Sequence, residues 1–195
     1  MRHIELKKLP LIFKLHDLER LGFSKNQLRG LLKVGKVERV AWGLYRARAS
    51  KATDLETIAL VCKKVPQAVV CLFSALRVQG IGTQAPREVW IALDRKARVP
   101  TFSGLPVRII RFSGQMLHYG VVSKDVQGVP VKITTPARTV VDCFRYRRKI
   151  GTDVALEALR DVLHRRLASR DELIRAAEKC RARTVMRPYL EALSS

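Results

Sequence analysis

One stretch near the N-terminus, FSKNQLRGLLKVGKVERVAWGLYRA from Phe23 to Ala47, restricts the fold of this chain more than any other. Ser24 is followed three residues later by Gln27, and this capping-box pattern predicts the start of a helix. The leucines that follow have the spacing of a single helical face: Leu28, Leu31 and Leu32. Such a face must be buried, because isolated amphipathic helices of this length are marginal in water.

A β-hairpin is predicted directly after this helix. Gly35 ends the helix, two strand-like runs cover Val37 to Val40 and Leu44 to Ala47, and Gly43 lies at the short turn between them. Short glycine-containing loops typically join antiparallel strands. Upstream, two short helical segments are expected, at Arg2 to Lys8 and at His16 to Leu21. Helices followed by a hairpin predict a winged helix-turn-helix over residues 1–48.

The charge of the chain indicates a polyanionic partner. There are 38 Lys and Arg against 17 Asp and Glu, giving a formal net charge of +21. Residues 1–48 alone hold 12 basic and 4 acidic side chains. An excess of this size is typical of proteins that bind nucleic acid, with an anionic membrane surface as the second candidate. No apolar run approaches the roughly 20 residues that a membrane-spanning helix needs, so we expect no membrane association.

The predicted helix and hairpin carry the side chains that DNA recognition requires. The N-terminal residues of a recognition helix reach base edges, where Asn and Gln pair with adenine and Arg or Lys with guanine. Basic residues of the hairpin are suited to phosphates. The predicted DNA-binding residues are Lys25, Asn26, Gln27, Arg29, Lys33, Lys36, Arg39, Trp42 and Arg46. The alternative is an amphipathic helix and hairpin with a solvated basic face, with Trp42 packed on the hairpin itself.

Residues 49–195 predict a mixed α/β domain that ends in helices, so that the whole chain is of the α+β class. Strands are expected at Val89 to Leu93, Val107 to Arg111 and Val129 to Ile133, and Thr135-Pro136 signals a helix start. Basic residues on the later helices are candidates for a partner or nucleic-acid surface: Arg145, Arg147, Arg148, Lys149, Arg165 and Arg166. The structural alternative is that the run Arg145 to Lys149 ends the helix that starts at Thr135-Pro136, where cations favour the negative end of its dipole. Further helices are expected with Thr152 as a cap, with Ser169 and Glu172 as a capping box, and from Thr184 to Leu193 despite Pro188.

Motifs of the common enzyme classes are absent from the sequence. There is no phosphate-binding GxxxxGK[ST] loop, no GxSxG and no HExxH, so we expect neither catalysis nor a cofactor. Glu88 and Asp94 flank one predicted strand with Lys96 beyond it, which leaves a metal-dependent nuclease as a minor alternative. The four cysteines form no CxxC pair and lie mostly in apolar runs. We expect them to be buried thiols, not metal ligands, in a reducing cytoplasm.

Four segments together resemble the AbiEi family of bacterial antitoxins. The first matches a pattern close to G-x-x-x-R-V-x-x-G-x-Y through Gly35, Arg39, Val40, Gly43 and Tyr45. The second is Ser74-Ala75-Leu76 with Gly80, and the third is the run REVWIAL. The fourth, T-x-P-A-R-T-V-x-D, contains Thr134, Pro136, Ala137, Arg138, Thr139, Val140 and Asp142. Thr135 as a helix cap and an Arg138–Asp142 pair explain this last motif structurally, whereas a catalytic role is the alternative.

The resemblance implies a two-domain protein of a type IV, abortive-infection toxin–antitoxin system. Its N-terminal domain would bind inverted repeats in its own promoter and repress the operon. Residues 49–195 would form an antitoxin domain that counteracts a nucleotidyltransferase-like toxin, without the need for a stable complex. Two alternatives remain: a winged-helix regulator with a ligand-sensing or partner-sensing C-terminal domain and no toxin, and a Mg²⁺-dependent enzyme.

Overall fold

The computed structural model of the chain describes residues 11–47, 55–102 and 104–192. The chain divides into two compact units. The first comprises Met1–Pro66, Pro100–Leu105 and Lys124–Val131, and the second comprises Gln67–Val99, Pro106–Ser123 and Lys132–Ser195. The helix expected at residues 2–8 and the domain boundary expected after residue 48 lie outside the described residues. Among the described helices, none has both the length and the apolar character required to cross a bilayer.

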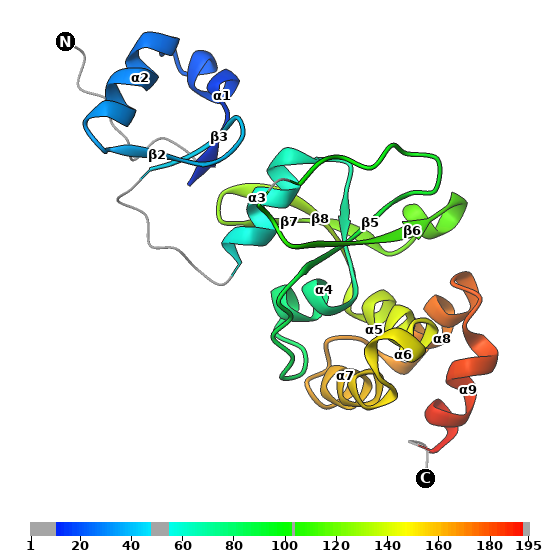
Figure 1. Cartoon of the computed structure of the whole chain (residues 1–195). Coiled ribbons are helices and arrows are strands. Elements are labelled where there is room, and N and C mark those ends of the chain that lie inside the picture. Colours follow the sequence, from blue (N-terminus) through cyan, green and yellow to red (C-terminus); the bar gives the residue numbers. More distant parts are fainter. Residues whose placement is uncertain (1–10, 48–54, 103, 193–195) are drawn as a thin grey trace. The chain divides into compact units, whose positions relative to one another are not determined.

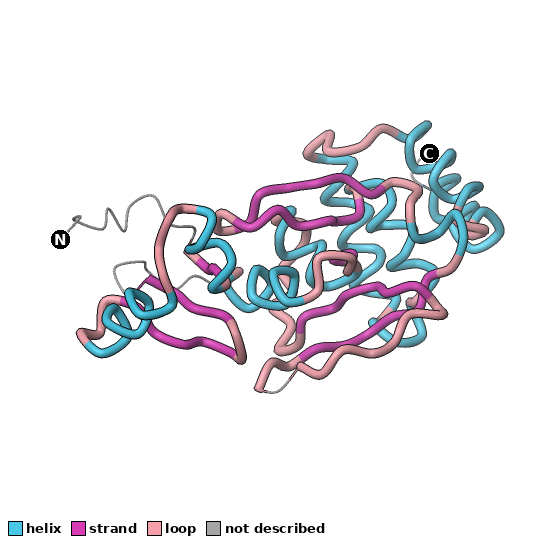
Figure 2. Tube along the Cα trace, turned by 90° about the horizontal axis from the view of Figure 1, so that it is seen from above, coloured by secondary structure: helices cyan, strands magenta, loops and turns pink. Residues whose placement is uncertain are grey.

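In its described residues, the first unit contains a short strand, two helices, a β-hairpin that pairs with this strand, and a further helix. Its elements are β1 (Ile12–Phe13), α1 (Leu15–Arg20), α2 (Lys25–Lys33), β2 (Val37–Ala41), β3 (Leu44–Ala47) and α3 (Glu56–Lys64). The three strands have the order β1-β3-β2. Figure 2 shows the β2–β3 hairpin as two magenta strands joined by a tight loop. The predicted hairpin and the predicted helices at residues 16–21 and 24–34 are confirmed to within a residue or two.

A small apolar core holds this unit together. Phe13, Leu18, Leu28, Leu31 and Val37 form one buried cluster, so that β1, α1, α2 and β2 each contribute to it. The Phe13 ring stacks on Tyr45 of β3, with 6.0 Å between ring centroids. Ile12 and Phe13 form a strand that pairs with β3.

The second unit is built on a five-stranded mixed sheet of order β6-β5-β4-β8-β7. Its strands are β4 (Val69–Val70), β5 (Val89–Asp94), β6 (Val107–Phe112), β7 (Val121–Val126) and β8 (Val129–Thr134), of which residues 124–131 are grouped with the first unit. Its helices are α4 (Leu72–Gln79), α5 (Pro136–Arg145), α6 (Arg147–Ile150), α7 (Thr152–His164), α8 (Arg170–Lys179) and α9 (Arg183–Ala192), with a 3₁₀ turn η2 (Gly114–Leu117).

Helix α5 is the centre of the second unit. Every residue of α5 from Ala137 to Phe144 is buried, and the helix contacts α4, α6, α7, α8 and α9. Figure 1 shows these helices gathered on one side of the sheet. The cluster that they form with β5 and β6 includes Trp90, Ile110, Phe144, Leu159 and Met186. The α+β class predicted for the chain agrees with this arrangement.

Two details of the predicted helices are wrong. The basic run Arg145 to Lys149 does not end one continuous helix, because α5 stops at Arg145 and a separate short helix begins at Arg147. Thr152 is the first residue of α7 and not its cap, since the cap position is held by Gly151 at a φ of 98°. A positive φ at this position favours glycine. Helix α9 continues through Pro188, as expected.

Candidate functional site

Helix α2 has one buried face and one polar face. The Ser24 side chain accepts a hydrogen bond from the Gln27 backbone N–H at 3.3 Å, and the Gln27 side chain accepts one from the Ser24 N–H at 2.7 Å. This reciprocal capping box satisfies two of the donors that a helix start leaves unpaired. Leu28 and Leu31 are buried in the core of the unit. The remaining face of α2 is therefore held outward by the packing of the opposite one.

Most of the predicted DNA-binding side chains are exposed in this region. Lys25, Asn26, Gln27, Arg29 and Lys33 project from α2, and Lys36, Arg39 and Trp42 follow on the connection and the hairpin. Gln27 differs from the others because its amide oxygen is already engaged by the Ser24 N–H. Its main contribution in the structure is thus to the helix start, whereas Lys25, Asn26 and Arg29 are exposed side chains in the first turns.

The tip of the β2–β3 hairpin combines an aromatic ring with a cation. Trp42 is 80% exposed, and the Arg39 guanidinium lies over its ring at 4.4 Å from the centroid. Trp42 and Gly43 form the two-residue turn, and Gly43 adopts a φ of 71°. A cation over an indole is a favourable pair. Trp42 therefore packs against Arg39 at the hairpin tip and not against the hairpin base.

Arg46 occupies a different environment from the other predicted DNA contacts. Its guanidinium forms ion pairs with Glu38 on the neighbouring strand and with Glu56 on α3, and its side chain is only 20% exposed. The hydrogen bond that Arg46 donates to the Glu38 carboxylate raises the pKa of Arg46 above its usual range. Arg46 thus links β3, β2 and α3, and this structural role separates it from the exposed cations of α2.

The Glu38–Arg46 pair results from an irregularity that the sequence does not indicate. Ala41 pairs with Leu44 across the two-residue turn, and a register shift between Arg39 and Ala41 then places Glu38 opposite Arg46. Regular pairing around the same turn would place Glu38 opposite Ala47. β-bulges insert one unpaired residue in this way. The sequence alone therefore does not predict that Glu38 and Arg46 face each other, because their pairing depends on the position of the bulge.

A second group of polar side chains is buried in the second unit. Arg138 and Asp142 of α5 are both 0% exposed, and Arg138 Nε donates to Asp142 Oδ2 at 2.9 Å. The other two guanidinium nitrogens donate to the carbonyl oxygens of Tyr119 at 2.6 Å and Met116 at 2.9 Å. The Thr135 hydroxyl caps the start of α5. The predicted cap and the predicted ion pair are both confirmed.

Close packing surrounds this ion pair. Gly120 has a φ of 61°, and a Cβ atom there would lie 2.9 Å from Arg138 Cβ, so a larger residue has no room. Burial raises the pKa of Asp142 to about 6, against the opposing effect of Arg138. The Thr134 and Thr139 hydroxyls share a hydrogen bond of 2.7 Å beside the pair. The Thr134–Asp142 motif therefore joins β8, α5 and the η2 segment in the interior.

Comparison with protein-family models gives a match to the AbiEi antitoxin C-terminal domain over residues 68–190. The chain belongs to the AbiEi antitoxin family. A solved structure, the RV2827C protein from Mycobacterium tuberculosis, shares the fold with a TM-score of 0.60 at 15% sequence identity. The similarity covers 88% of this chain and 68% of that one. A search of curated proteins gave no match.

The basic residues predicted as a partner surface in this AbiEi antitoxin are not equivalent. Arg148, Lys149 and Arg166 are exposed. Arg145 is exposed as well and contacts the Met116 sulfur at 3.1 Å, whereas the half-buried Arg147 donates to the Phe144 carbonyl at 3.0 Å. Arg165 pairs with Asp161 and donates to the Gly80 carbonyl. Three of the six residues therefore make local contacts, and the partner surface itself stays a prediction.

The residues considered for metal chemistry have structural partners in this family member. Glu88 pairs with Arg108 at 3.0 Å, and Asp94 accepts a hydrogen bond from the Lys96 backbone N–H at 2.7 Å. Within residues 11–47, 55–102 and 104–192, no group of three or more His, Cys, Asp or Glu side chains could hold a metal ion. The cysteines Cys62, Cys71, Cys143 and Cys180 are buried and unpaired, as predicted.

Proposed function

We propose that this AbiEi-family antitoxin also represses its own operon, by binding inverted repeats in the promoter through a winged helix-turn-helix at residues 1–48. The observation that carries the proposal is the exposed polar face of α2, which the capping box and the buried leucines hold outward beside a basic hairpin. A helix that reads the major groove needs this combination of one buried and one polar face. The net charge of +21 supports a polyanionic partner.

The geometry supports separate roles for the exposed side chains. Lys25, Asn26 and Arg29 are placed in the first turns of α2, where recognition helices contact base edges. Three further cations, Lys33, Lys36 and Arg39, would neutralise phosphates and position the protein. In this proposal the β2–β3 hairpin is the wing, and Trp42 lies against a sugar–phosphate edge. Gln27 would stabilise the start of the helix through its hydrogen bond with Ser24, and Arg46 would stabilise the wing through its ion pairs with Glu38 and Glu56.

The second part of the proposal concerns the antitoxin activity itself. Membership in the family rests on residues 68–190, which lie beyond the helix and hairpin described above. We infer that this region counteracts a nucleotidyltransferase-like toxin encoded beside the gene, in the type IV manner that does not require a stable complex. The antitoxin activity would then reside in the mixed sheet and the helices that pack against it.

Binding of the full chain to its own upstream DNA tests the repressor function. We expect preference for the inverted repeat over a scrambled duplex, with log K falling linearly with log salt at a slope of about −0.9 per phosphate contact. Replacing both Lys25 and Arg29 by Ala should weaken operator binding, whereas Arg95→Ala with Lys96→Ala, exposed in the second unit, is the matched control. Equal affinity for both duplexes would overturn this function.

Co-expression with the neighbouring toxin gene tests the antitoxin function. Growth should be restored by the wild-type chain and by the Lys25, Arg29 double variant, because the second unit remains intact in that variant. Loss of rescue by the wild-type chain while operator binding persists would favour the alternative of a regulator without a toxin partner.

A further inference from the structure

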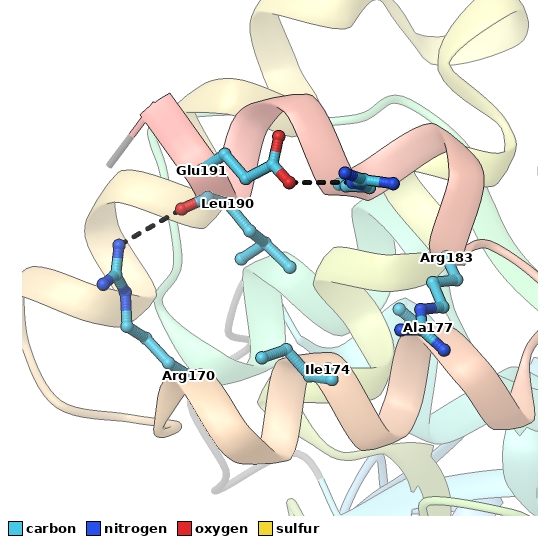
Figure 3. Close-up of a pocket in the computed structure, with 7 residues that line it drawn as sticks. Arg170, Ile174, Ala177, Arg183, Leu190 and Glu191 are labelled. Carbon is cyan, nitrogen blue, oxygen red and sulfur yellow. Dashed lines mark hydrogen bonds and ion pairs between the residues drawn. The ribbon is translucent and has the colours of Figure 1, made fainter. Parts of the chain in front are cut away.

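A groove lies between α8 and α9 in the second unit. It has a volume of about 260 Å³ and is lined by Ile174, Ala177 and Leu190, with Arg170, Arg183, Arg187 and Glu191 around them. Figure 3 shows Ile174 on α8 and Leu190 on α9 pointing toward each other, with the charged side chains on either side. The groove thus has an apolar centre and a rim that is mainly cationic.

The apolar centre is narrow and open to solvent. Ile174 is 41% exposed, although Leu173 and Ala177 on the same helix are buried. Pockets that enclose a drug-sized molecule usually measure about 300–1,000 Å³, so the groove is smaller than a pocket of that kind. It has room for one flat ring between the two aliphatic side chains, while the rest of a larger ligand stays outside.

The arginines of the rim have donors for an anion. Arg183 pairs with Glu178 at 3.1 Å and Arg187 with Glu191 at 2.7 Å, and both arginine side chains are 73% exposed. Each of these contacts uses one nitrogen atom, whereas a guanidinium group carries five N–H donors. Exposed ion pairs contribute little to stability. Both arginines can therefore bind phosphate oxygens, which the planar guanidinium group matches in geometry.

A flat ring that carries phosphate fits both parts of the groove. Unpaired nucleobases are bound between apolar side chains and stack on guanidinium planes. Arg170 provides such a plane at one end of the groove, where it donates to the Leu190 carbonyl at 3.2 Å (Figure 3). The excess charge of +21 favours a polyanion and repels a second copy of the chain. Charge and shape together indicate a nucleotide.

A wider hollow beside α7 has a different character. Its lining includes the carboxylates of Asp153, Glu157 and Asp161. The Gly82 N–H donates to Asp161 at 3.0 Å and the Thr83 N–H donates to Glu157 at 2.9 Å, so both carboxylates are held in place. Three carboxylates repel phosphate, and the α8–α9 groove is the better site for a nucleotide.

We propose that the α8–α9 groove binds one unpaired nucleotide, with its base between Ile174 and Leu190 and its phosphates on Arg183 and Arg187. This rests on the proposed antitoxin function, since a protein can counteract a nucleotidyltransferase-like toxin without holding it by occupying what that toxin uses. The nucleotide is either a free nucleoside triphosphate or the end of a single strand. Paired bases of a duplex cannot enter the groove, because they are stacked inside the helix.

Fluorescence anisotropy measures this binding in the full chain with Lys25→Ala and Arg29→Ala, so that the helix proposed to bind the operator contributes little. One probe is a labelled single-stranded RNA of about ten nucleotides, and the other is a set of labelled nucleoside triphosphates. Binding of the RNA alone indicates a strand end, whereas binding of a triphosphate indicates a free nucleotide. Binding of neither probe, equal affinity for the RNA as a blunt duplex, or tighter binding of a polyglutamate peptide would overturn the proposal.

Groove variants separate the contribution of the phosphates from that of the base. Arg183→Glu with Arg187→Glu should weaken binding about tenfold or more and reduce the salt slope by about 1.4, at about 0.7 per phosphate contact of a single strand. Ile174→Ser should weaken binding about tenfold with the slope unchanged, because it removes no charge. Arg95→Glu with Lys96→Glu makes the same change in net charge outside the groove and should keep the original affinity. Equal effects of the two double variants would contradict the site.

Photo-crosslinking of the wild-type chain does not depend on the folding of any variant. An RNA of the same length that contains 4-thiouridine should crosslink to residues of α8 or α9 under near-ultraviolet light, as identified by mass spectrometry of the digested adduct. Crosslinks confined to α2 and the β2–β3 hairpin would refute binding in the groove.

Growth rescue connects the groove with the antitoxin activity. Both groove variants should rescue toxin-expressing cells about tenfold less well than the wild-type chain, and circular dichroism melts confirm that each variant is folded. Failure of rescue by the wild-type chain would remove the proposed function and leave the binding result unaffected. Full rescue by variants that no longer bind the RNA or the triphosphates would overturn the role of the groove and leave the proposed function in place.

Discussion

Arg138 shows how a charged residue can belong to a protein core. Each of its three guanidinium nitrogens donates a hydrogen bond, one to Asp142 and two to backbone carbonyls before β7. The Phe112 ring lies 5.0 Å from the guanidinium carbon. Burying an isolated charge is costly, but the ion pair with Asp142 and the hydrogen bonds to the two carbonyls offset much of that cost. The motif that resembles a catalytic set is therefore explained by packing.

Removing one partner of this pair should be more damaging than removing both. Asp142→Asn leaves the Arg138 charge uncompensated in the interior and should lower the free energy of unfolding by about 3–5 kcal/mol. The double variant Arg138→Met, Asp142→Leu should lose less. Urea unfolding followed by Trp90 fluorescence in a Trp42→Phe background measures both, since the chain has two tryptophans. A double variant less stable than Asp142→Asn would contradict the assignment.

Arg46 lies in strand β3 of the hairpin and Lys36 directly precedes strand β2, but replacement of the two residues should have different effects. Arg46→Met leaves Glu56, which is 8% exposed, without its ion-pair partner, and should cost about 1–3 kcal/mol of stability. Lys36→Met changes an exposed side chain and should alter stability by less than about 0.5 kcal/mol, while it reduces the salt slope of operator binding by about 1. Thermal melts and salt titrations of both variants would separate the two roles. Equal loss of stability would refute them.

At the scale of elements, helix α2 is stabilised at its start and weakened in its middle. The capping box fixes its first turn, but Gly30 lies within the helix, where glycine is less favourable than alanine. A Cβ atom at Gly30 would meet no other atom within 4 Å. A residue with a Cβ atom at position 30 would therefore fit and should make the helix more stable.

Gly30→Ala should raise the free energy of unfolding by about 1 kcal/mol, because it reduces the backbone freedom lost on folding. The same substitution at Gly22 is the matched control. Gly22 has a φ of 82°, so alanine there should destabilise the chain by about 1 kcal/mol. Urea denaturation of the two variants gives both values, and a loss of stability in Gly30→Ala would show that α2 is packed more closely than described.

Elements with local signals could be predicted from the sequence. The capping boxes at Ser24 and Ser169 and the Thr135-Pro136 start all hold in the structure. The features that the sequence did not predict depend on contacts between residues far apart in the chain. Strand β1 depends on pairing with β3, which lies about thirty residues later. The bulge that brings Arg46 opposite Glu38, and the third partner Glu56, depend on tertiary contacts.

At the scale of the whole molecule, the candidate DNA-binding residues were easier to predict than the groove. Five of the former lie on α2 and the other four follow between Lys36 and Arg46, so that all belong to one short segment. The groove brings together residues of α8 and α9, and its apolar centre is evident only from the exposure of Ile174. The buried residues of α8 are Leu173, Ala176 and Ala177, and Ile174 lies outside the helical face that they share.

The four cysteines should not react in the native protein. All four are buried, and burial raises the pKa of Cys62 to about 12 and that of Cys180 to about 11, so thiolate is scarce at neutral pH. A thiol-reactive dye should label the native chain very slowly and should label four sites in strong denaturant. Rapid labelling of a native thiol would show that one of them becomes accessible.

The same burial makes the chain a convenient carrier for spectroscopic probes. A cysteine introduced at an exposed position, for example in place of Lys36 or Ile174, would be the one rapidly labelled thiol without removal of any native cysteine. A fluorophore or spin label at such a position could then test the proposed binding of DNA. Because the native sulfur atoms are buried, a thiol introduced on the surface can be labelled selectively.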